Sequence, residues 1–185
     1  FHLLKTLGPE KTFFPTLPAE ISRGCWWRRS QGTVKDAGCA FCNLNLQWTG
    51  YRSKYPKQVV HEIDNLSKKY QTLSVAFTDN LLPVKSSREI FERLEKLDKD
   101  FRFFGEIRAS TSKPVLEAMR AAGTEEVQIG IEALSTRLLK KLNKGTTAIQ
   151  NLEIMKSCEA LGIENISNLI LYFPGSDERD VALTL

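Results

Sequence analysis

Short apolar runs alternate with amphipathic helix patterns along most of this chain, and that alternation is its strongest constraint on the fold. Apolar residues recur at intervals of three and four in four separate segments, which is the spacing of one helix face. A run of strand-forming residues precedes each of these segments along the chain. Strands joined by helices of this length form parallel units with right-handed crossovers. The sequence therefore predicts an α/β fold built on a parallel sheet or barrel.

Local start and stop signals set the expected boundaries of these elements. Ser86 and Glu89 form a capping box before the second helix, and Gly123 follows the third. Thr147 and Gln150 form another capping box before the last long helix. The helical spacing covers residues 59–70, 90–97, 115–122 and 152–161, with a short helix at 135–142. The predicted strands cover residues 21–24, 73–78, 101–108, 127–132 and 166–172.

Polar side chains share one face of two predicted strands. Because alternate residues of a strand face opposite sides, Glu106 and Arg108 lie together near the carboxyl end of the third strand. Gln128 and Glu132 lie together on the fourth, opposite a wholly apolar face. Parallel α/β folds bind their ligands at the carboxyl ends of the strands. We therefore expect a barrel interior that holds a polar cofactor.

The two ends of the chain predict its organisation. Residues 1–20 contain three prolines and read as a linker or lead-in from an upstream domain, whereas residues 21–185 hold the core. The chain opens at Phe1 and ends in the start of a helix pattern. We expect a fragment of a longer protein, with a partial barrel truncated after about five βα units.

Composition excludes several classes of protein. A hydrophobic content of 42% supports a packed core, and no apolar run is long enough to span a membrane. The net charge of +4 is mild and dispersed, which argues against a nucleic-acid partner. Three of the four cysteines lie close together in the sequence, and no signal peptide precedes them. These features favour the cytoplasm over a disulfide-rich secreted setting.

The three clustered cysteines predict a metal or iron–sulfur site. Cys39 and Cys42 form a C-x-x-C pair, and thirteen residues that include two glycines separate Cys25 from Cys39. Three ligands of a cubane cluster leave one iron open for a small molecule. A zinc knuckle with His61 as fourth ligand, or plain core thiols, fits the same spacing, and His61 otherwise reads as a surface residue. Cys158 lies on an apolar helix stripe, as expected of a small buried thiol.

These motifs together resemble the radical S-adenosylmethionine (SAM) enzymes. Cys39-Ala40-Phe41-Cys42 is similar to the C-x-aromatic-C end of the cluster loop in that family. The other matches follow in family order on successive strands, and the resemblance covers residue 21 to the end. They are Phe77-Thr78-Asp79-Asn80, Gly105-Glu106-Ile107-Arg108-Ala109, Gln128-Ile129-Gly130-Ile131-Glu132 and the stretch from Asn168 to Gly175.

One branch of the family is the most similar. The cobalamin-dependent C-methyltransferases that mature ribosomal peptides resemble this chain at Arg23-Gly24-Cys25-Trp26-Trp27, at 51–54 and at 138–147. The sequence departs from the family in two respects. An insertion from Arg28 to Gly38 lengthens the spacing between the first two cysteines, and five strands are predicted where the family barrel has six and a further carboxyl-terminal portion.

The resemblance implies a set of cofactors and site residues. Cys25, Cys39 and Cys42 would ligate a 4Fe-4S cluster whose fourth iron chelates SAM, and reductive cleavage of SAM would start radical chemistry on the substrate. The implied SAM contacts are Phe41 with adenine, Asp79 or Asn80 with the methionyl ammonium, Arg108 with its carboxylate and Glu132 with the ribose, with Glu106, Gln128 and Asn168 also in the site.

The resemblance also implies partners, and other functions stay open. A reductase or flavodoxin-type protein would donate the electron, and a peptide or small molecule would be the substrate. Carbon methylation would need cobalamin, carried by a domain upstream of Phe1 in the full-length parent. The alternatives are a noncatalytic zinc-binding or interaction module, and a cobalamin-independent radical SAM enzyme that modifies RNA or another large substrate. Interior ion pairs would equally account for Glu106, Arg108 and Glu132.

Overall fold

The computed structural model describes residues 15–27, 38–44 and 50–185. Residues 1–14 of the predicted lead-in and residues 28–37 of the predicted insertion lie outside these ranges. In chain order the elements are β1 (Leu17–Ala19), β2 (Ser22–Arg23), β3 (Arg52–Ser53), α1 (Pro56–Tyr70), β4 (Ser74–Phe77), α2 (Ser87–Glu95), β5 (Arg102–Arg108), α3 (Lys113–Ala121), β6 (Thr124–Gly130), α4 (Thr136–Lys141), α5 (Ala148–Ala160), β7 (Glu164–Ile166) and α6 (Glu178–Ala182).

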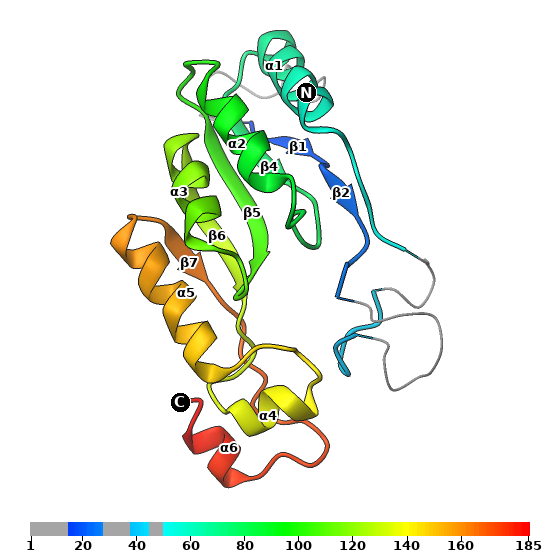
Figure 1. Ribbon diagram of the computed structural model, residues 1–185, viewed down its shortest axis with the longest axis vertical. Helices are drawn as coiled ribbons and strands as arrows, with labels where there is room; N and C mark the ends of the chain where they lie inside the picture. The colour runs from blue at the N-terminus through cyan, green and yellow to red at the C-terminus, as the bar shows by residue number, and fades with distance from the viewer. Residues whose placement is uncertain (1–14, 28–37, 45–49) are drawn as a thin grey trace, which may run out of the picture.

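Five of the described strands form one parallel sheet in the order β1-β4-β5-β6-β7. Helices α1, α2, α3 and α5 lie along one side of this sheet, and α4 and α6 lie together beyond its carboxyl end (Figure 1). β2 and β3 form a separate antiparallel pair beside the sheet. The sheet is an open part of a barrel, so the predicted α/β fold with a partial parallel barrel is confirmed.

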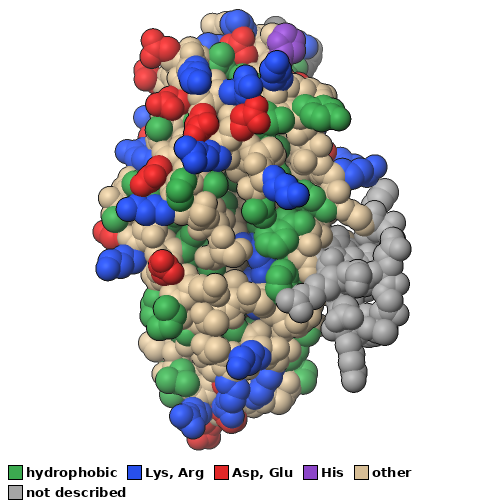
Figure 2. Space-filling view, in the orientation of Figure 1, with side chains coloured by type: hydrophobic (Ala, Val, Ile, Leu, Met, Phe, Trp, Pro, Cys, Tyr) green, Lys and Arg blue, Asp and Glu red, His purple; other side chains and the backbone are tan. Residues whose placement is uncertain are grey.

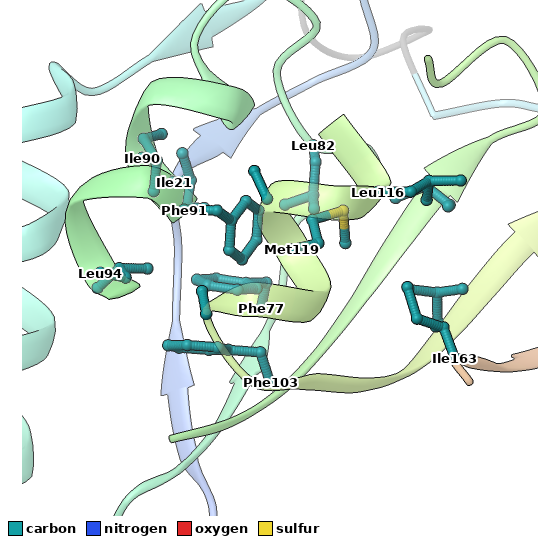
Figure 3. Close-up of a cluster of buried hydrophobic side chains, with 14 of the residues drawn as sticks. Ile21, Phe77, Leu82, Ile90, Phe91, Leu94, Phe103, Leu116, Met119 and Ile163 are labelled. Carbon is teal, nitrogen blue, oxygen red and sulfur yellow. The ribbon is translucent and has the colours of Figure 1, made fainter. Parts of the chain in front are cut away.

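Aromatic side chains pack the helical layer against the sheet. Phe91 of α2 is fully buried and meets Phe77 of β4 and Phe103 of β5 edge-on, with ring centroids 5.8 and 5.9 Å apart. Phe77 and Phe103 stack at 5.5 Å, and Leu116 and Met119 of α3 close the cluster (Figure 3). Such pairs add about 0.5–1.5 kcal/mol each beyond the apolar area they bury. The opposite face of the same strands is left for the polar residues.

The first strand lies earlier than the sequence predicts. The predicted strand at 21–24 is wrong for the main sheet, because Leu17–Ala19 form β1 and pair with β4. After β1 the chain turns away, since the Asp79 carboxylate accepts hydrogen bonds from the backbone N–H groups of Ile21 and Ser22. Pro18 argues against a strand at this position of the sequence because proline has no backbone N–H to donate, but a proline is tolerated on an edge strand such as β1.

Two other expected boundaries differ from the structure. The predicted strand at 166–172 is placed too late, because β7 is Glu164–Ile166 and only an isolated bridge joins Leu169 to Glu132 further on. The predicted capping box at Ser86 is wrong, because Ser86 has helical backbone angles and its side chain makes no capping hydrogen bond. The box of Thr147 with Gln150 is confirmed at the start of α5.

The described surface carries charges of both signs. Lys and Arg side chains are interspersed with Asp and Glu over the end that bears α1 and α2 (Figure 2). Several are paired along α2, where Arg88 meets Glu92 and Arg93 meets Glu89 at 2.6 and 2.8 Å. Among the described helices none is long and apolar enough to cross a membrane.

Candidate functional site

A pocket of about 160 Å³ lies at the carboxyl ends of β4, β5 and β6. One wall comes from the sheet and one from the segment that carries the clustered cysteines. We call them the sheet wall and the cysteine wall. The sheet wall consists of Asn80, Leu81, Glu106, Ile107, Arg108, Gln128, Gly130 and Glu132, together with Lys144, and the cysteine wall consists of Cys25, Cys39, Phe41, Cys42 and Leu44.

Strand register brings the polar residues of the sheet wall together. β5 pairs with β6 so that Glu106 lies beside Gln128 and Arg108 lies beside Gly130. Residues that pair across adjacent strands share a face, so the side chains of Glu106 and Gln128 point into the same space. Burial raises the pKa of the Glu106 carboxyl above its usual range. The predicted polar face is thus the lining of a single pocket.

Glu132 follows β6 in a backbone conformation that side chains rarely adopt. Its φ is +64°, a left-handed conformation that usually costs a non-glycine residue free energy. Hydrogen bonds lock this backbone on both sides: the buried Asn151 side chain donates to the carbonyls of Ile131 and Ala133, at 2.9 and 2.8 Å. The Glu132 N–H donates to the carbonyl of Asn168 at 3.2 Å. The Glu132 side chain is therefore aimed into the pocket by residues outside it.

A lysine shares the pocket with Glu132. The Lys144 ammonium lies 2.8 Å from the Glu132 carboxylate and 5.7 Å from the Phe41 ring centroid, and the lysine side chain is only 7% exposed. A side chain at position 130 would come within 2.7 Å of this ammonium, so glycine there makes room for it. Lys144 thus links the sheet wall to the cysteine wall.

Arg108 occupies the boundary between the walls. Its guanidinium carbon lies 5.5 Å from the Trp26 ring centroid and 4.7 Å from that of Trp27, and it donates a hydrogen bond to the Lys144 carbonyl. The side chain is buried, and its Nε has no partner among the described residues. A buried, unpaired guanidinium N–H is a donor available to an anionic or polar ligand.

The cysteine wall brings all three predicted ligands to the pocket. Cys25 and Cys39 are half-buried and Cys42 is exposed. Burial raises the pKa of the Cys39 thiol, while Lys144 and Arg108 oppose the shift through their positive charges. Within the described residues no three His, Cys, Asp or Glu side chains are grouped closely enough to hold a metal ion.

Two predicted SAM contacts lie elsewhere. Asp79 and Asn168 do not line the pocket formed by the described residues. The buried Asp79 carboxylate accepts the backbone bonds at the start of β2 and a 2.6 Å bond from the Ser22 hydroxyl, so Asn80 is the residue of that pair that reaches the pocket. Burial raises the pKa of the Asp79 carboxyl, and its three donors oppose that shift. Asn168 meets the site through its carbonyl bond to Glu132.

A match to a known protein family identifies the family to which this fold belongs. The Radical SAM superfamily matches residues 20–185, which is most of the chain. The chain belongs to the radical SAM superfamily. The family predicted from the sequence motifs is therefore confirmed, and with it the prediction that the chain is part of an enzyme.

Curated relatives are similar over most of this chain. An uncharacterised methyltransferase of Pyrococcus horikoshii is 26% identical over 151 residues, which are 80% of this chain and 33% of that protein. The hopanoid C-3 methylase of Methylococcus capsulatus is 24% identical over 164 residues, which are 86% of this chain and 29% of that protein. The chain spans about a third of the length of these relatives.

Solved radical SAM structures share the fold. The cobalamin-dependent SAM radical enzyme OxsB, with aqua-cobalamin and SAM bound, has a TM-score of 0.72 and 23% identity, covering 91% of this chain and 26% of that one. The radical SAM methyltransferase TsrM from Kitasatospora setae, with cobalamin and a 4Fe-4S cluster bound, has a TM-score of 0.74 and 17% identity, covering 89% and 32%. At these identities the likeness shows the fold alone.

Sequence reasoning missed Lys144 as a residue of this radical SAM pocket. It lies after α4 rather than on a strand, so strand parity could not find it. The segment 138–147 stood out only through its resemblance to one branch of the family. His61, the zinc candidate, is exposed on α1, where its ring hydrogen-bonds with Asn65.

Proposed function

We propose that this chain is the core of a radical SAM enzyme that holds a 4Fe-4S cluster and SAM between its two pocket walls. The observation that carries the proposal is the shared pocket, in which Cys25, Cys39 and Cys42 face polar residues from three strand ends. Thiolates are the ligands of iron–sulfur clusters, so the chemistry of the donor set fits the group. When bound, the cluster would supply one electron for the reductive cleavage of SAM, and the radical so released would act on the substrate.

The sheet wall would bind and orient SAM. Glu132 is suited to accept hydrogen bonds from ribose hydroxyls, and Phe41 offers a half-exposed ring for adenine. Asn80 would accept from the methionyl ammonium, and the unpaired Arg108 Nε would donate to the carboxylate. Glu106 and Gln128 lie side by side at the base of the wall and would complete the polar contacts. Asn168 supports Glu132 through its backbone carbonyl, whereas Asp79 holds the backbone at Ile21 and Ser22 that leads to Cys25.

Single cysteine substitutions test the cluster. Anaerobically reconstituted Cys25→Ala, Cys39→Ala and Cys42→Ala should each lose cluster iron and sulfide, because three thiolates are the proposed ligands. Cys158→Ala is the matched control and should keep both, since Cys158 is buried on α5 outside the pocket. Full iron in the Cys25 variant would overturn the ligand set. Stoichiometric zinc without sulfide in the wild type would overturn the cluster itself.

Glu132→Gln and Arg108→Gln separate SAM binding from cluster binding. Each variant should keep its iron but bind SAM more weakly in anaerobic calorimetry, because both residues are proposed SAM contacts and neither is a proposed cluster ligand. Asn65→Asp, on the surface of α1, serves as the control. Unchanged SAM affinity in both pocket variants would show that Glu132 and Arg108 do not bind SAM, and would favour a structural role in interior ion pairs.

We also propose that the full-length parent methylates its substrate with the help of cobalamin. OxsB and TsrM are both cobalamin-bound in their solved structures, and two relatives are named as methylases or methyltransferases. Methyl transfer to an unactivated carbon needs both a substrate radical and a methyl donor, and a peptide or small molecule would fit as substrate. The electron would come from a reductase or flavodoxin-type protein, and such chemistry suits the cytoplasm. Full activity of the parent with cobalamin stringently excluded would overturn this branch of the proposal.

A further inference from the structure

The turn after α4 is hydrogen-bonded to the cysteine wall on both sides of Cys39. The Asn143 side-chain N–H donates to the Gly38 carbonyl at 2.6 Å, across 105 positions of sequence. The backbone N–H of Ala40 donates to the Leu142 carbonyl at 2.8 Å. These two bonds bracket Cys39, since Gly38 precedes it and Ala40 follows it.

The same turn holds the segment that begins at Cys25. The Trp27 indole N–H donates to the Asn143 carbonyl at 2.8 Å, across 116 positions of sequence. The Trp27 ring also covers Gly145, where an added Cβ would lie 1.9 Å from a ring carbon. Trp27 lies two residues after Cys25 in the sequence. The turn therefore contacts both cysteine-bearing segments within two residues of a proposed ligand.

The backbone of the turn is shaped for this contact. Asn143 and Gly145 both have positive φ, at +49° and +73°, and asparagine and glycine are the residues that adopt this conformation at least cost. Between them, Lys144 directs its ammonium to Glu132 and its carbonyl to Arg108. The turn thus contacts the sheet wall through Lys144 and the cysteine wall through its two neighbours.

We propose that Asn143 and Gly145 are positioning residues that clamp Cys25 and Cys39 against the sheet wall, so that retention of the cluster depends on a turn that supplies no ligand. The inference rests on the proposed function. Cys39 is bracketed by two hydrogen bonds to the turn and Cys25 is anchored through Trp27. Loss of the clamp leaves all three thiols in the chain but frees the segments that bring them together.

Three variants and one matched control test the clamp. Asn143→Asp keeps the size of the side chain and Asn143→Gly keeps the left-handed backbone, but both remove the donor to Gly38. Gly145→Ala introduces a Cβ into the Trp27 ring. Gly162→Ala carries the same kind of backbone strain, at φ +64°, in open space after α5, and so reports strain without the contact.

The readouts are cluster retention and folding, measured separately. The wild type and Gly162→Ala should release iron to a chelator at the same slow rate under anaerobic conditions. The two Asn143 variants and Gly145→Ala should release it about tenfold faster, the factor that corresponds to 1.4 kcal/mol. The thermal unfolding midpoints of the apo Asn143 variants should stay close to that of the wild type, because the changes remove no side chain from either buried hydrophobic cluster.

Each outcome decides between the two proposals. Iron release at the wild-type rate in all three variants would overturn the clamp and leave the cluster assignment standing. Equal acceleration in Gly162→Ala would assign the effect to backbone strain and also overturn the clamp. A wild-type protein that binds no iron and sulfide would instead overturn the proposed function on which the clamp rests.

Discussion

The sheet wall and the cysteine wall of the pocket are held in different ways. On the sheet wall, β5 and β6 are paired along most of their length, so Glu106 and Gln128 are fixed by continuous backbone hydrogen bonding. The described part of the cysteine wall is held instead by short pairings and side-chain contacts, among them the two-residue pairing of β2 with β3, the Asp79 carboxylate and the turn after α4. A wall fixed by a sheet resists change at any one residue, whereas a wall fixed by a few side chains depends on each of them.

The largest expected effect comes from the scaffold of the sheet wall. Phe91→Ala should lower the free energy of unfolding by about 3–5 kcal/mol, because it empties a fully buried site that packs edge-on against two aromatic rings. Urea unfolding followed by circular dichroism measures the loss. Cys42→Ala, on the exposed part of the cysteine wall, should change it by less than about 0.5 kcal/mol. Similar losses in both variants would remove the distinction between the walls.

Asn151→Asp tests a place where the sheet wall depends on a side chain rather than on strand pairing. It should lower the free energy of unfolding by about 1–3 kcal/mol, because the carbonyls of Ile131 and Ala133 lose their buried donor. SAM affinity should fall as well, since the backbone of Glu132 is no longer held on both sides. Asn65→Asp makes the same change on the surface of α1 and should alter neither quantity. Wild-type SAM affinity in a folded Asn151→Asp protein would show that Glu132 holds its position unaided.

A pH effect is expected where α6 meets α4. The hydrogen bond from Ser135, and the ion pairs with Lys141 and Arg137, hold the pKa of Asp180 well below its usual range. A carboxyl whose pKa is lower in the folded than in the unfolded state stabilises the fold above the unfolded pKa of about 3.9. That stability is lost as the pH falls towards the folded pKa. Urea midpoints measured from pH 6 to pH 3 should therefore drop more steeply for the wild type than for Asp180→Asn, and parallel curves would contradict the assignment.

The smallest effect is expected at Cys158, away from both walls. Burial raises the pKa of this thiol to about 11, so only about one molecule in a thousand carries the thiolate at pH 8. Iodoacetamide should label Cys42 in the folded apo protein at pH 8 and leave Cys158 unmodified, as read by peptide mass spectrometry. Rapid labelling of Cys158 under native conditions would show that α5 opens away from the sheet.

The difference between the walls also explains how far the sequence predicts this molecule. Alternation along β5 and β6 is a local pattern, so the sequence alone places Glu106, Gln128 and Glu132 on the pocket face. The contacts of Asn143 with Gly38 and of Trp27 with the turn join residues more than 100 positions apart. The local periodicity of helices and strands cannot predict contacts between such distant residues.

The errors at the strand ends have the same physical origin. Ile21 reads as the start of a strand because it is apolar, and it is indeed buried, but its backbone is turned by a carboxylate 58 residues away. The same carboxylate belongs to Asp79, one of the two residues predicted to bind the methionyl ammonium, and its bonds to this backbone favour Asn80 for that role. A polar residue at a strand end can bind a ligand or hydrogen-bond to the protein's own backbone, and the hydrogen-bond distances in the structure distinguish the two.

The close approach of Lys144 to Gly130 limits which substitutions these two positions can accept during evolution. A methyl group at position 130 would displace the end of a flexible side chain rather than backbone, so the fold would accept it. The cost would fall on the contact between Lys144 and Glu132. Among related chains, positions 130 and 144 should therefore exchange residues as a pair, with a larger residue at 130 accompanied by a shorter one at 144. A library randomised at both positions and selected for SAM binding would show this correlation even where neither single change survives.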